Sequence, residues 1–303
     1  MKNSIRLLGA MSLLLFAGCS AWPRVTHPPQ LHNPFPQLER VAVLPFFNQS
    51  SSPNLDGLQV AEAYQTELQK VRGFQVMPVT VVDQYLRDHQ VPIDETTDFQ
   101  QLARDLGVDV LVVGSVTSFD PYPPPRIGLA VDWYAANPGF HPIPAGYGLP
   151  WGTAEEEFVP DALVWEAEFQ LAKQQLKTQT PDPTSVQPAG SLQFPPPGQP
   201  ADWPDPQGFV PPEPLVDRPP FRAHRGPLME MVRQYDAADT ETLGKLQVYH
   251  SWQEEVRPGG WKGHLQRSDD FIRFCCHLHL SELLAARGGV DRSTLALRVP
   301  GGR

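Results

Sequence analysis

The sequence predicts an α/β fold: a single small mixed β-sheet domain with covering helices, interrupted by a proline-rich insertion. Short β-rich runs alternate with apolar residues at helical 3–4 spacing over residues 38–136. A further strand pattern and two helix patterns follow at residues 228–290. Between these two parts, from Pro138 to Pro227, lie more than half of the chain's 35 prolines. Because strands that alternate with helices build a parallel or mixed sheet under a helical cover, the two parts are expected to complete one domain.

The first part, residues 38–136, alternates strand and helix patterns. The β-rich runs are residues 40–47, 74–78, 108–119 and 126–134. The third run is nearly continuous in valine and leucine and predicts a buried strand, whereas the fourth alternates and predicts a half-exposed strand. Asp56 is expected to cap a helix that ends at Gly73, because an Asp side chain accepts hydrogen bonds from free N–H groups at a helix start. Thr80 and Thr97 are expected to cap two further helices.

The second part begins with a strand pattern at residues 228–236, which is expected to rejoin the first sheet. Two helix patterns follow, and their capping residues stay open: Asp239 or Thr240 for the first, and Ser268 or Asp269 for the second. The second helix is stopped by Gly288 and its neighbour. Its polar arc contains only Arg273, His277 and Ser281. This helix is therefore expected to pack over the sheet.

The linking segments are expected to lie outside the core. Residues 19–37 carry several prolines and few core-forming residues, which predicts an extended tether of about 50 Å at ~3.1 Å per residue. Residues 137–227 are expected to be largely irregular, because proline lacks a backbone N–H and blocks helix interiors. Within them, residues 155–177 mix apolar and charged residues and predict either a helix or a strand. Residues 291–303 form a C-terminal tail.

The N-terminus predicts an exported, lipid-anchored protein. Lys2 and Arg6 precede an apolar run at residues 7–17, which has the length of a signal-peptide core and is too short to span a bilayer. The run ends in Phe16-Ala17-Gly18-Cys19, which resembles the bacterial lipobox. We expect residues 1–18 to be a lipoprotein signal peptide and Cys19 to be the lipidation site, where two or three acyl chains hold the protein at a membrane. The alternative is an ordinary secretory signal with an incidental cysteine.

Composition excludes several classes of partner and scaffold. The formal net charge is −10, and cleavage of the signal removes Lys2 and Arg6 as well, so nucleic-acid binding is not expected. No later segment has the 18 consecutive apolar residues of a membrane-spanning helix. After lipidation only Cys275 and Cys276 remain, and adjacent cysteines rarely form a disulfide. Stability is therefore expected to come from an apolar core.

Three groups of residues suggest chemistry. Cys275, Cys276, His277 and His279 are metal-ligand types on one helix, but a closed zinc site needs a second ligand pair, which only His250 or His264 offers. The other interpretation is two small buried cysteines in a core helix, and the choice stays open. The acidic run at residues 155–157 is typical of a solvated face. Ser115 in "VVGSV" lacks the second glycine of a nucleophile elbow. The sequence therefore predicts no enzyme and no cofactor.

Four stretches within residues 40–134 carry a resemblance: "VAVLPFFN", a helix ending "ELQKVRGFQVMP", then "VVDQYL", then "LARDLGVDVLVVGSVTSF". After a lipobox, this order resembles the lipoprotein superfamily of the curli secretion lipoprotein CsgG, the penicillin-binding-protein activator lipoproteins and the N-terminal domain of TolB. The resemblance implies a small α/β domain for protein–protein contact in the periplasm, with no catalytic residues to transfer. Asp236 loosely fits an Asp that precedes a turn in these families. A curli-type pore is not expected, because proline cannot donate to a barrel ladder.

The sequence therefore predicts a membrane-anchored, periplasm-facing lipoprotein that acts as a non-enzymatic adaptor or assembly factor for cell-envelope proteins. The alternative is a structural scaffold that self-associates as a homo-oligomer. Ser20 after the lipidated cysteine favours the outer membrane, with the inner membrane left open. Trp151, Trp165 and Trp203 are candidate anchors for a partner, whose identity the sequence does not reveal.

Overall fold

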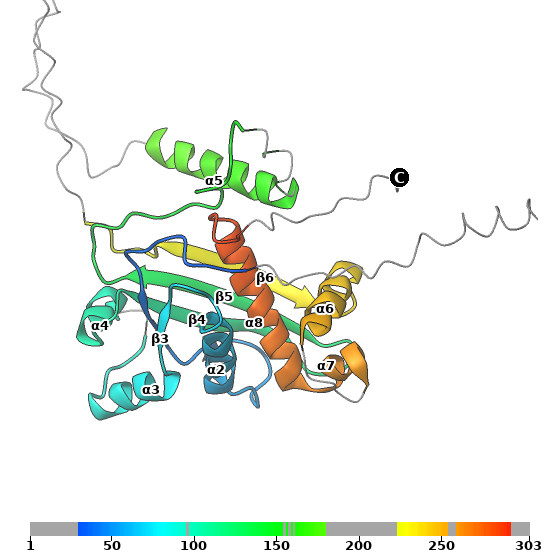
Figure 1. The fold of residues 1–303 in the computed structure, drawn as a ribbon. Helices are drawn as coiled ribbons and strands as arrows, with labels where there is room; N and C mark the ends of the chain where they lie inside the picture. Colours follow the sequence, from blue (N-terminus) through cyan, green and yellow to red (C-terminus); the bar gives the residue numbers. More distant parts are fainter. Residues whose placement is uncertain are drawn as a thin grey trace, which may run out of the picture.

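The computed structural model describes residues 30–94, 97–153, 156, 159, 161–179, 223–253 and 259–291. Their fold is a single mixed β-sheet covered by helices, which confirms the predicted α/β class (Figure 1). The signal segment, Cys19 and Ser20 lie outside the described residues.

The sheet has six strands, in the order β3-β1-β4-β5-β6, with β2 paired to β4. Their bounds are β1 (Arg40–Val43), β2 (Phe47–Asn48), β3 (Gln75–Met77), β4 (Val110–Asp120), β5 (Arg126–Ala135) and β6 (Met229–Asp236). Strand β1 runs parallel to β3 and β4, whereas β4, β5 and β6 are antiparallel neighbours. The segment after the insertion therefore rejoins the first sheet, as the sequence predicts, because all eight residues of β6 pair with β5.

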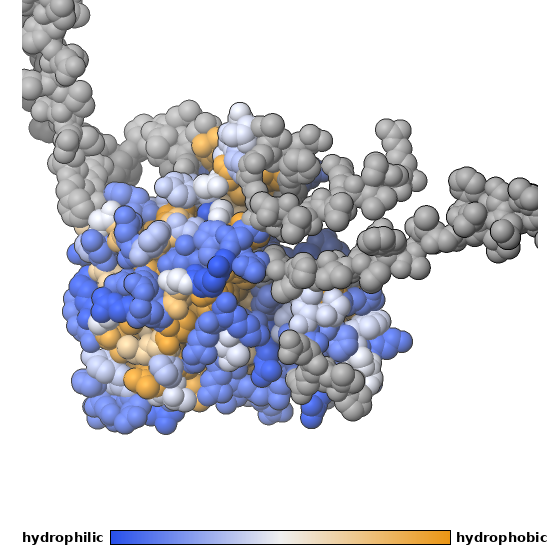
Figure 2. All heavy atoms as spheres, viewed as in Figure 1, coloured by the Kyte–Doolittle hydropathy of each residue, from blue (hydrophilic) through white to orange (hydrophobic). Residues whose placement is uncertain are grey.

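Helices cover both faces of the sheet. The described helices are α2 (Gly57–Leu68), α3 (Val79–Asp88), α4 (Phe99–Asp105), α5 (Asp161–Gln179), α6 (Thr240–Trp252), α7 (Gly263–Gln266) and α8 (Ser268–Ala285), with a 3-10 turn η3 (Gly260–Lys262). Helices α2 and α8 pack together on one face, and α3 and α4 pack on the other. On the side of the molecule in Figure 2, hydrophilic residues cover most of the surface and apolar residues show in patches between them.

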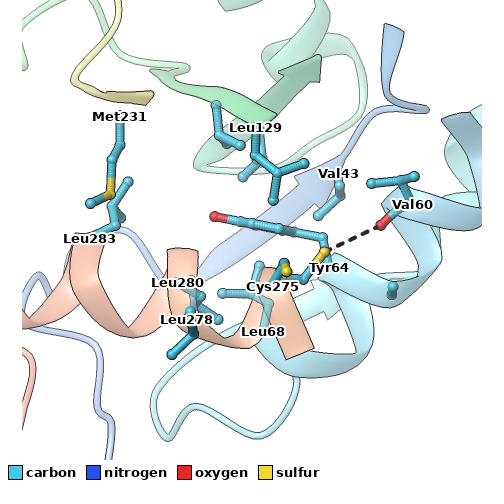
Figure 3. Close-up of a cluster of buried hydrophobic side chains, with 14 of the residues drawn as sticks. Val43, Val60, Tyr64, Leu68, Leu129, Met231, Cys275, Leu278, Leu280 and Leu283 are labelled. Carbon is cyan, nitrogen blue, oxygen red and sulfur yellow. Dashed lines mark hydrogen bonds between the residues drawn. The ribbon is translucent and has the colours of Figure 1, made fainter. Parts of the chain in front are cut away.

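The larger core lies between the sheet and the pair α2–α8 (Figure 3). Tyr64 of α2 and Cys275 of α8 are fully buried there, against Leu129 of β5. Along β5, Leu129, Val131 and Trp133 point into this core, while Ala130 and Asp132 between them are only half-buried. Each fully buried side chain of this size contributes on the order of 1.5–3 kcal/mol, so this layer accounts for much of the stability.

Two of the predicted caps are confirmed. The carboxylate of Asp56 accepts a hydrogen bond from the Leu58 N–H at 2.9 Å, and Asp239 accepts one from the Thr242 N–H at 3.1 Å. The helix after Asp56 ends at Leu68 rather than at Gly73, which adopts a left-handed φ of 89° in the following turn.

Two predicted caps are wrong. Asp98, not Thr97, caps α4, because its carboxylate reaches the N–H groups of both Gln100 and Gln101. Thr80 lies inside α3, which starts after Pro78. The first N–H of α3, from Val79, instead donates to the side chain of Gln65 in α2 at 2.7 Å, so no local cap is needed.

The start of α8 also differs from the prediction. Ser268 is its first helical residue and Arg267 holds the cap position without a side-chain hydrogen bond. Asp269 and Asp270 lie in the first turn, where carboxylates favour the positive end of the helix dipole. Charge therefore takes the place of a capping side chain.

The packed domain extends further toward the N-terminus than residue 38, where the sequence places the end of the tether. Leu31 pairs antiparallel with Val290, and His32 pairs with Arg72. Phe35 is buried in the larger core. The N–H of Asp291 donates to the Gln30 carbonyl at 2.9 Å, so the two ends of the described domain lie side by side.

Part of the expected irregular insertion is ordered as well. Residues 161–179 form the 19-residue helix α5, the helical choice of the two predicted for this segment. The N–H of Ile143 donates to the Leu228 carbonyl at 2.7 Å, and the Arg287 side chain donates to the Ile143 carbonyl at 3.0 Å. These contacts fix the start of the insertion to β6 and to the end of α8.

Candidate functional site

A groove of about 1280 Å³ is lined by residues of α5, α6, α8 and β6. Leu31 and Val290, which lie close to the two ends of the described domain, also line the groove. They pair with each other at its rim. The volume exceeds the roughly 300–1,000 Å³ typical of small-molecule pockets. A groove bounded by helices and larger than a small-molecule pocket is one geometry in which proteins bind peptide segments.

One wall of the groove is aromatic and faces solvent. Trp165 and Phe169 are one turn apart on α5 and their rings stack, with centroids 5.7 Å apart and planes at 11°. Trp165 is 69% exposed and Phe169 is 56% exposed. Val248 of α6, on the lining of the same groove, is 40% exposed. Large apolar side chains left in water on two walls of one groove favour a protein contact there.

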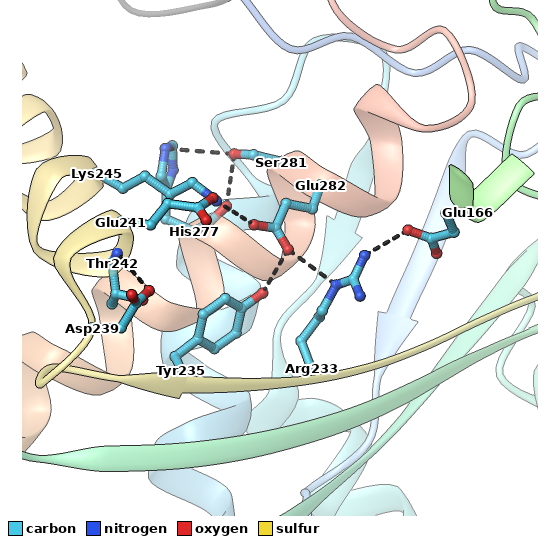
Figure 4. Close-up of polar contacts among 10 residues, drawn as sticks. All are labelled: Glu166, Arg233, Tyr235, Asp239, Glu241, Thr242, Lys245, His277, Ser281 and Glu282. Carbon is cyan, nitrogen blue, oxygen red and sulfur yellow. Dashed lines mark hydrogen bonds and ion pairs between the residues drawn. The ribbon is translucent and has the colours of Figure 1, made fainter. Parts of the chain in front are cut away.

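The floor of the groove is a network of ion pairs centred on Glu282 of α8 (Figure 4). Its carboxylate lies 3.4 Å from Nε of Arg233 and 3.0 Å from Nζ of Lys245, and it accepts a hydrogen bond from the Tyr235 hydroxyl at 3.2 Å. Arg233 also pairs with Glu166 of α5 at 2.5 Å. The network therefore joins α5, α6 and α8 to β6.

The charge states in this network are fixed by their neighbours. Desolvation opposes the charged form of Lys245, but its pairs with Glu241 and Glu282 outweigh this and raise its pKa. Burial, with the Glu282 carboxylate next to it, raises the pKa of Tyr235 well above its ordinary value, so the hydroxyl stays a donor. The Glu282 carboxylate thus has three partners, which suits it to positioning the helices around the groove.

The lining carries more negative than positive charge. The acidic residues are Glu166, Asp239, Glu241 and Glu282, and the basic ones are Arg233 and Lys245. Added to a chain of net charge −10, this balance favours a bound segment that is cationic as well as apolar.

A buried carboxylate joins α2 to α8 beside the groove. The side chain of Glu67 is 1% exposed, and its oxygens lie 2.6 Å from Lys70 Nζ and 3.2 Å from His277 Nδ1. Burial raises the pKa of Glu67, but the hydrogen bonds from His277 and Lys70 outweigh it and hold the pKa below its ordinary value. His277 also lines the groove, so this pair supports the wall that α8 forms.

Cys275 and Cys276 of α8 lie in the core. This is the second of the two interpretations that the sequence left open, buried core cysteines rather than metal ligands. Both are fully buried, and burial raises the pKa of the Cys275 and Cys276 thiols. The Cys276 thiol points at the Val60 carbonyl, 4.0 Å away. His279 is one turn from Cys275, but its Nε2 lies 3.2 Å from the Met231 carbonyl.

The two histidines that the sequence offered as further metal ligands, His250 and His264, lie against each other. His250 Nδ1 lies 3.3 Å from His264 Nε2. Within the part of the chain that the structure describes, no group of three or more His, Cys, Asp or Glu is arranged to hold a metal ion. The residues that sequence analysis grouped by ligand type are thus divided between a core helix and a separate histidine pair.

Other predicted residues fall in different places. Trp165 lines the groove, whereas Trp151 is 40% exposed and donates from Nε1 to the Gly146 carbonyl at 2.7 Å. Ser115 lies within β4, opposite Ala130 of β5. Cys19 and Trp203 lie outside the described residues.

Two residues of turns and loops have structural partners. The Asp236 carboxylate accepts a hydrogen bond from the Ala238 N–H at 2.7 Å, which forms a turn at the end of β6. Glu156, of the acidic run, accepts one from the Gly152 N–H at 2.9 Å.

Among the described helices, none is both long and apolar enough to cross a membrane.

Sequence analysis missed the ionic floor of the groove. Alternation along β6 places Arg233 and Tyr235 on the same side as buried Met229 and Met231, and a charged residue in such a row signals a buried or half-buried ion pair. The partner, Glu282, was missed because it lies on α8, and no local pattern in the sequence links α8 to Arg233 of β6.

No protein-family model matches the chain, and a search of curated proteins returns no match. Solved structures match parts of it. Lipoprotein GNA1162 from Neisseria meningitidis is 18% identical at a TM-score of 0.27, over 32% of this chain and 69% of that one. The LpoB C-terminal domain from Salmonella enterica is 11% identical at 0.25, over 35% and 77%. The PelC dodecamer from Paraburkholderia phytofirmans is 13% identical at 0.21, over 36% and 69%. At these TM-scores the likeness carries no argument about function, and the superfamily resemblance stays a prediction.

Proposed function

We propose that this chain is an envelope lipoprotein, anchored through lipid on Cys19, that binds a partner envelope protein in the groove and catalyses no reaction. The observation that carries the proposal is the stacked pair Trp165 and Phe169, exposed at the wall of a groove whose floor is fixed by ion pairs. An adaptor needs a rigid site with apolar anchors, and this site has both.

The aromatic pair offers enough apolar surface to support binding. Aromatic side chains of this type bury 150–250 Å² each when covered. With exposures of 69% and 56%, a partner would remove on the order of 250 Å² from water. At ~25 cal/mol per Å² this is about 6 kcal/mol before the costs of association. The pair is therefore expected to dominate the affinity.

A site-specific photo-crosslinker in the full chain in cells tests the proposal. The probe replaces Val248, which lines the groove, or Tyr122, which is 78% exposed in the β4–β5 turn and does not line it. We expect an adduct with another envelope protein from position 248 and none from position 122. An adduct with a second copy of this chain would instead favour the scaffold alternative.

A matched pair of substitutions separates the groove from general surface effects. Phe169 and Leu171 are both 56% exposed on α5, but only Phe169 lines the groove. Phe169→Ala should abolish the adduct from position 248, and Leu171→Ala should preserve it. Equal adducts in both variants would show that the aromatic wall is not the contact.

The membrane and its side are part of the same proposal. Lipid on Cys19 and Ser20 at the next position support an outer-membrane protein that faces the periplasm. Density-gradient separation of the two membranes tests this, and recovery with the inner membrane would correct the sorting while leaving the groove proposal intact.

A further inference from the structure

We propose that the C-terminal tail of this chain, residues 292–303, occupies the groove and must be displaced when the partner binds. This inference rests on the proposed function, because it assigns a regulator to the same groove. The argument uses three observations: where the described chain ends, how far the tail can reach, and the charge of the groove against that of the tail.

The described chain ends at the rim of the groove. Val290 lines the groove and pairs antiparallel with Leu31, another lining residue. Asp291 is held there by His32 at 3.0 Å and by an ion pair with Arg72. Residue 292 therefore starts at the mouth of the groove.

The tail is long enough to follow the groove. Along α8 the lining residues run from Ala285 back to His277, a rise of about 12 Å at 1.5 Å per residue. Along α5 they run from Leu163 to Gln170, about 10 Å. Residues 292–303 can span at most ~40 Å when extended, so half of them suffice to reach the far end.

The chemistry of the tail matches the lining. Its sequence, RSTLALRVPGGR, contains three arginines and no acidic residue, whereas the lining has four carboxylates against two cations. Leu295, Leu297 and Val299 are spaced two apart, so in an extended segment they share one face. That face would cover Trp165 and Phe169 while the arginines meet the carboxylates.

The long segment from residue 180 to 222 fits less well. It starts at the end of α5, but it carries Asp182, Asp202, Asp205, Glu213 and Asp217 against only Arg218 and Arg222. An acidic segment is repelled by an acidic lining. The charge balance thus selects the C-terminal tail.

A binding assay in trans tests the proposal. The probe is a fluorescein-labelled peptide of residues 292–303, titrated against the full chain in detergent and against the same chain ending at Asp291. The shortened chain keeps the Val290–Leu31 pair and the ion pairs of Asp291, and a thermal melt checks that it folds. Because a tethered segment has a millimolar effective concentration, we expect the peptide to bind the full chain at least tenfold more weakly than the shortened chain.

Controls in the same assay test the contacts. Phe169→Ala in the shortened chain should weaken peptide binding, and Leu171→Ala should not. A peptide with Leu295→Asp and Leu297→Asp should fail to bind. Equal affinity for the full and shortened chains, or no binding to the shortened chain, would overturn the proposal, as would a full-chain dimer that becomes a monomer when the tail is removed.

The photo-crosslinker at position 248 distinguishes this inference from the proposed function. If both hold, removal of the tail increases the adduct with the partner. An unchanged adduct would refute the tail as the occupant and leave the docking function standing. If neither chain forms an adduct with a partner, the docking function fails, while the peptide titration still decides whether the tail binds.

Discussion

His279 is expected to make the protein acid-labile between pH 7 and pH 5. Its ring is fully buried between α8 and β6, with Nε2 3.2 Å from the Met231 carbonyl and the Tyr64 ring 5.9 Å away. Burial, reinforced by the charges of Arg233 and Arg287, lowers the pKa of His279 to about 4. The folded protein therefore holds this histidine neutral.

The size of the effect follows from the two pKa values. In the unfolded chain a histidine has a pKa of about 6.5, so both states are neutral above pH 7 and His279 contributes no pH dependence there. As the pH falls below about 6.5, the unfolded chain binds a proton that the folded protein does not, and stability is lost. With a folded pKa of about 4, His279 alone removes about 2 kcal/mol of stability when the pH falls from 7 to 5.

Urea unfolding at pH 7 and pH 5 measures this loss. His279→Gln keeps an N–H donor for the Met231 carbonyl but does not titrate, so the variant should lose about 2 kcal/mol less than wild type over the same step. His89→Gln, at the exposed position directly after α3, is the control and should behave as wild type. The lowered pKa of Glu67 acts on stability mainly below its unfolded value of about 4.3. Asp132, whose pKa is raised to about 6, gains stability over this step, but it does so in wild type and variant alike and cancels in the comparison. If His279→Gln loses as much as wild type, the buried neutral histidine is not the cause.

Four further results are expected. Cys19→Ser should leave the chain unprocessed or free of membranes, and its continued cleavage and recovery with lipid would contradict the lipidation site. Asp132 has a pKa raised to about 6 by burial and by the nearby Glu230 carboxylate, so Asp132→Asn should stabilise the fold at pH 7 but not at pH 4; because the site is partly exposed, the gain is about 1 kcal/mol in urea unfolding. Changing Cys275 and Cys276 together to Ala should cost about 1–2 kcal/mol, with no metal lost by elemental analysis; stoichiometric zinc in wild type would overturn the core interpretation. Replacing residues 180–222 with a short Gly/Ser linker should preserve cooperative unfolding, since loop length costs only ~0.6 kcal/mol per doubling, and a molten product would show that this segment belongs to the core.

The sequence was most informative where a local rule decides the structure. Valine-rich and alternating runs gave β4, β5 and β6 to within two residues, because side-chain period follows directly from strand geometry. Asp56 was identified as a cap, and Asp239 was one of two candidates, because their partners lie within three residues.

Prediction failed where a distant residue supplies the contact. The start of α3 depends on Gln65, which lies 14 residues before Val79, and no local pattern reveals it. The groove depends on Arg233 meeting Glu166 across 67 residues, which fixes α5 beside β6. From the sequence, Trp165 was a candidate anchor, and it lies on the α5 wall of the groove. The ionic floor and the α6 wall depend on contacts between residues distant in the sequence, which no local pattern reveals.

The short Leu31–Val290 bridge also sets how the domain responds to mechanical force. A force applied to the N-terminal segment acts first on residue 30 of the described domain. The contacts that follow, to residues 289–291 and to Arg72, would break one after another before the force reaches β1, as in a zipper geometry. A ligand that covers both Leu31 and Val290 would bridge the two sides of this zipper. Occupancy of the groove should therefore raise the force needed to peel the N-terminal segment from the domain. On the proposed anchoring through Cys19, a filled groove would then carry load between the membrane and the sheet.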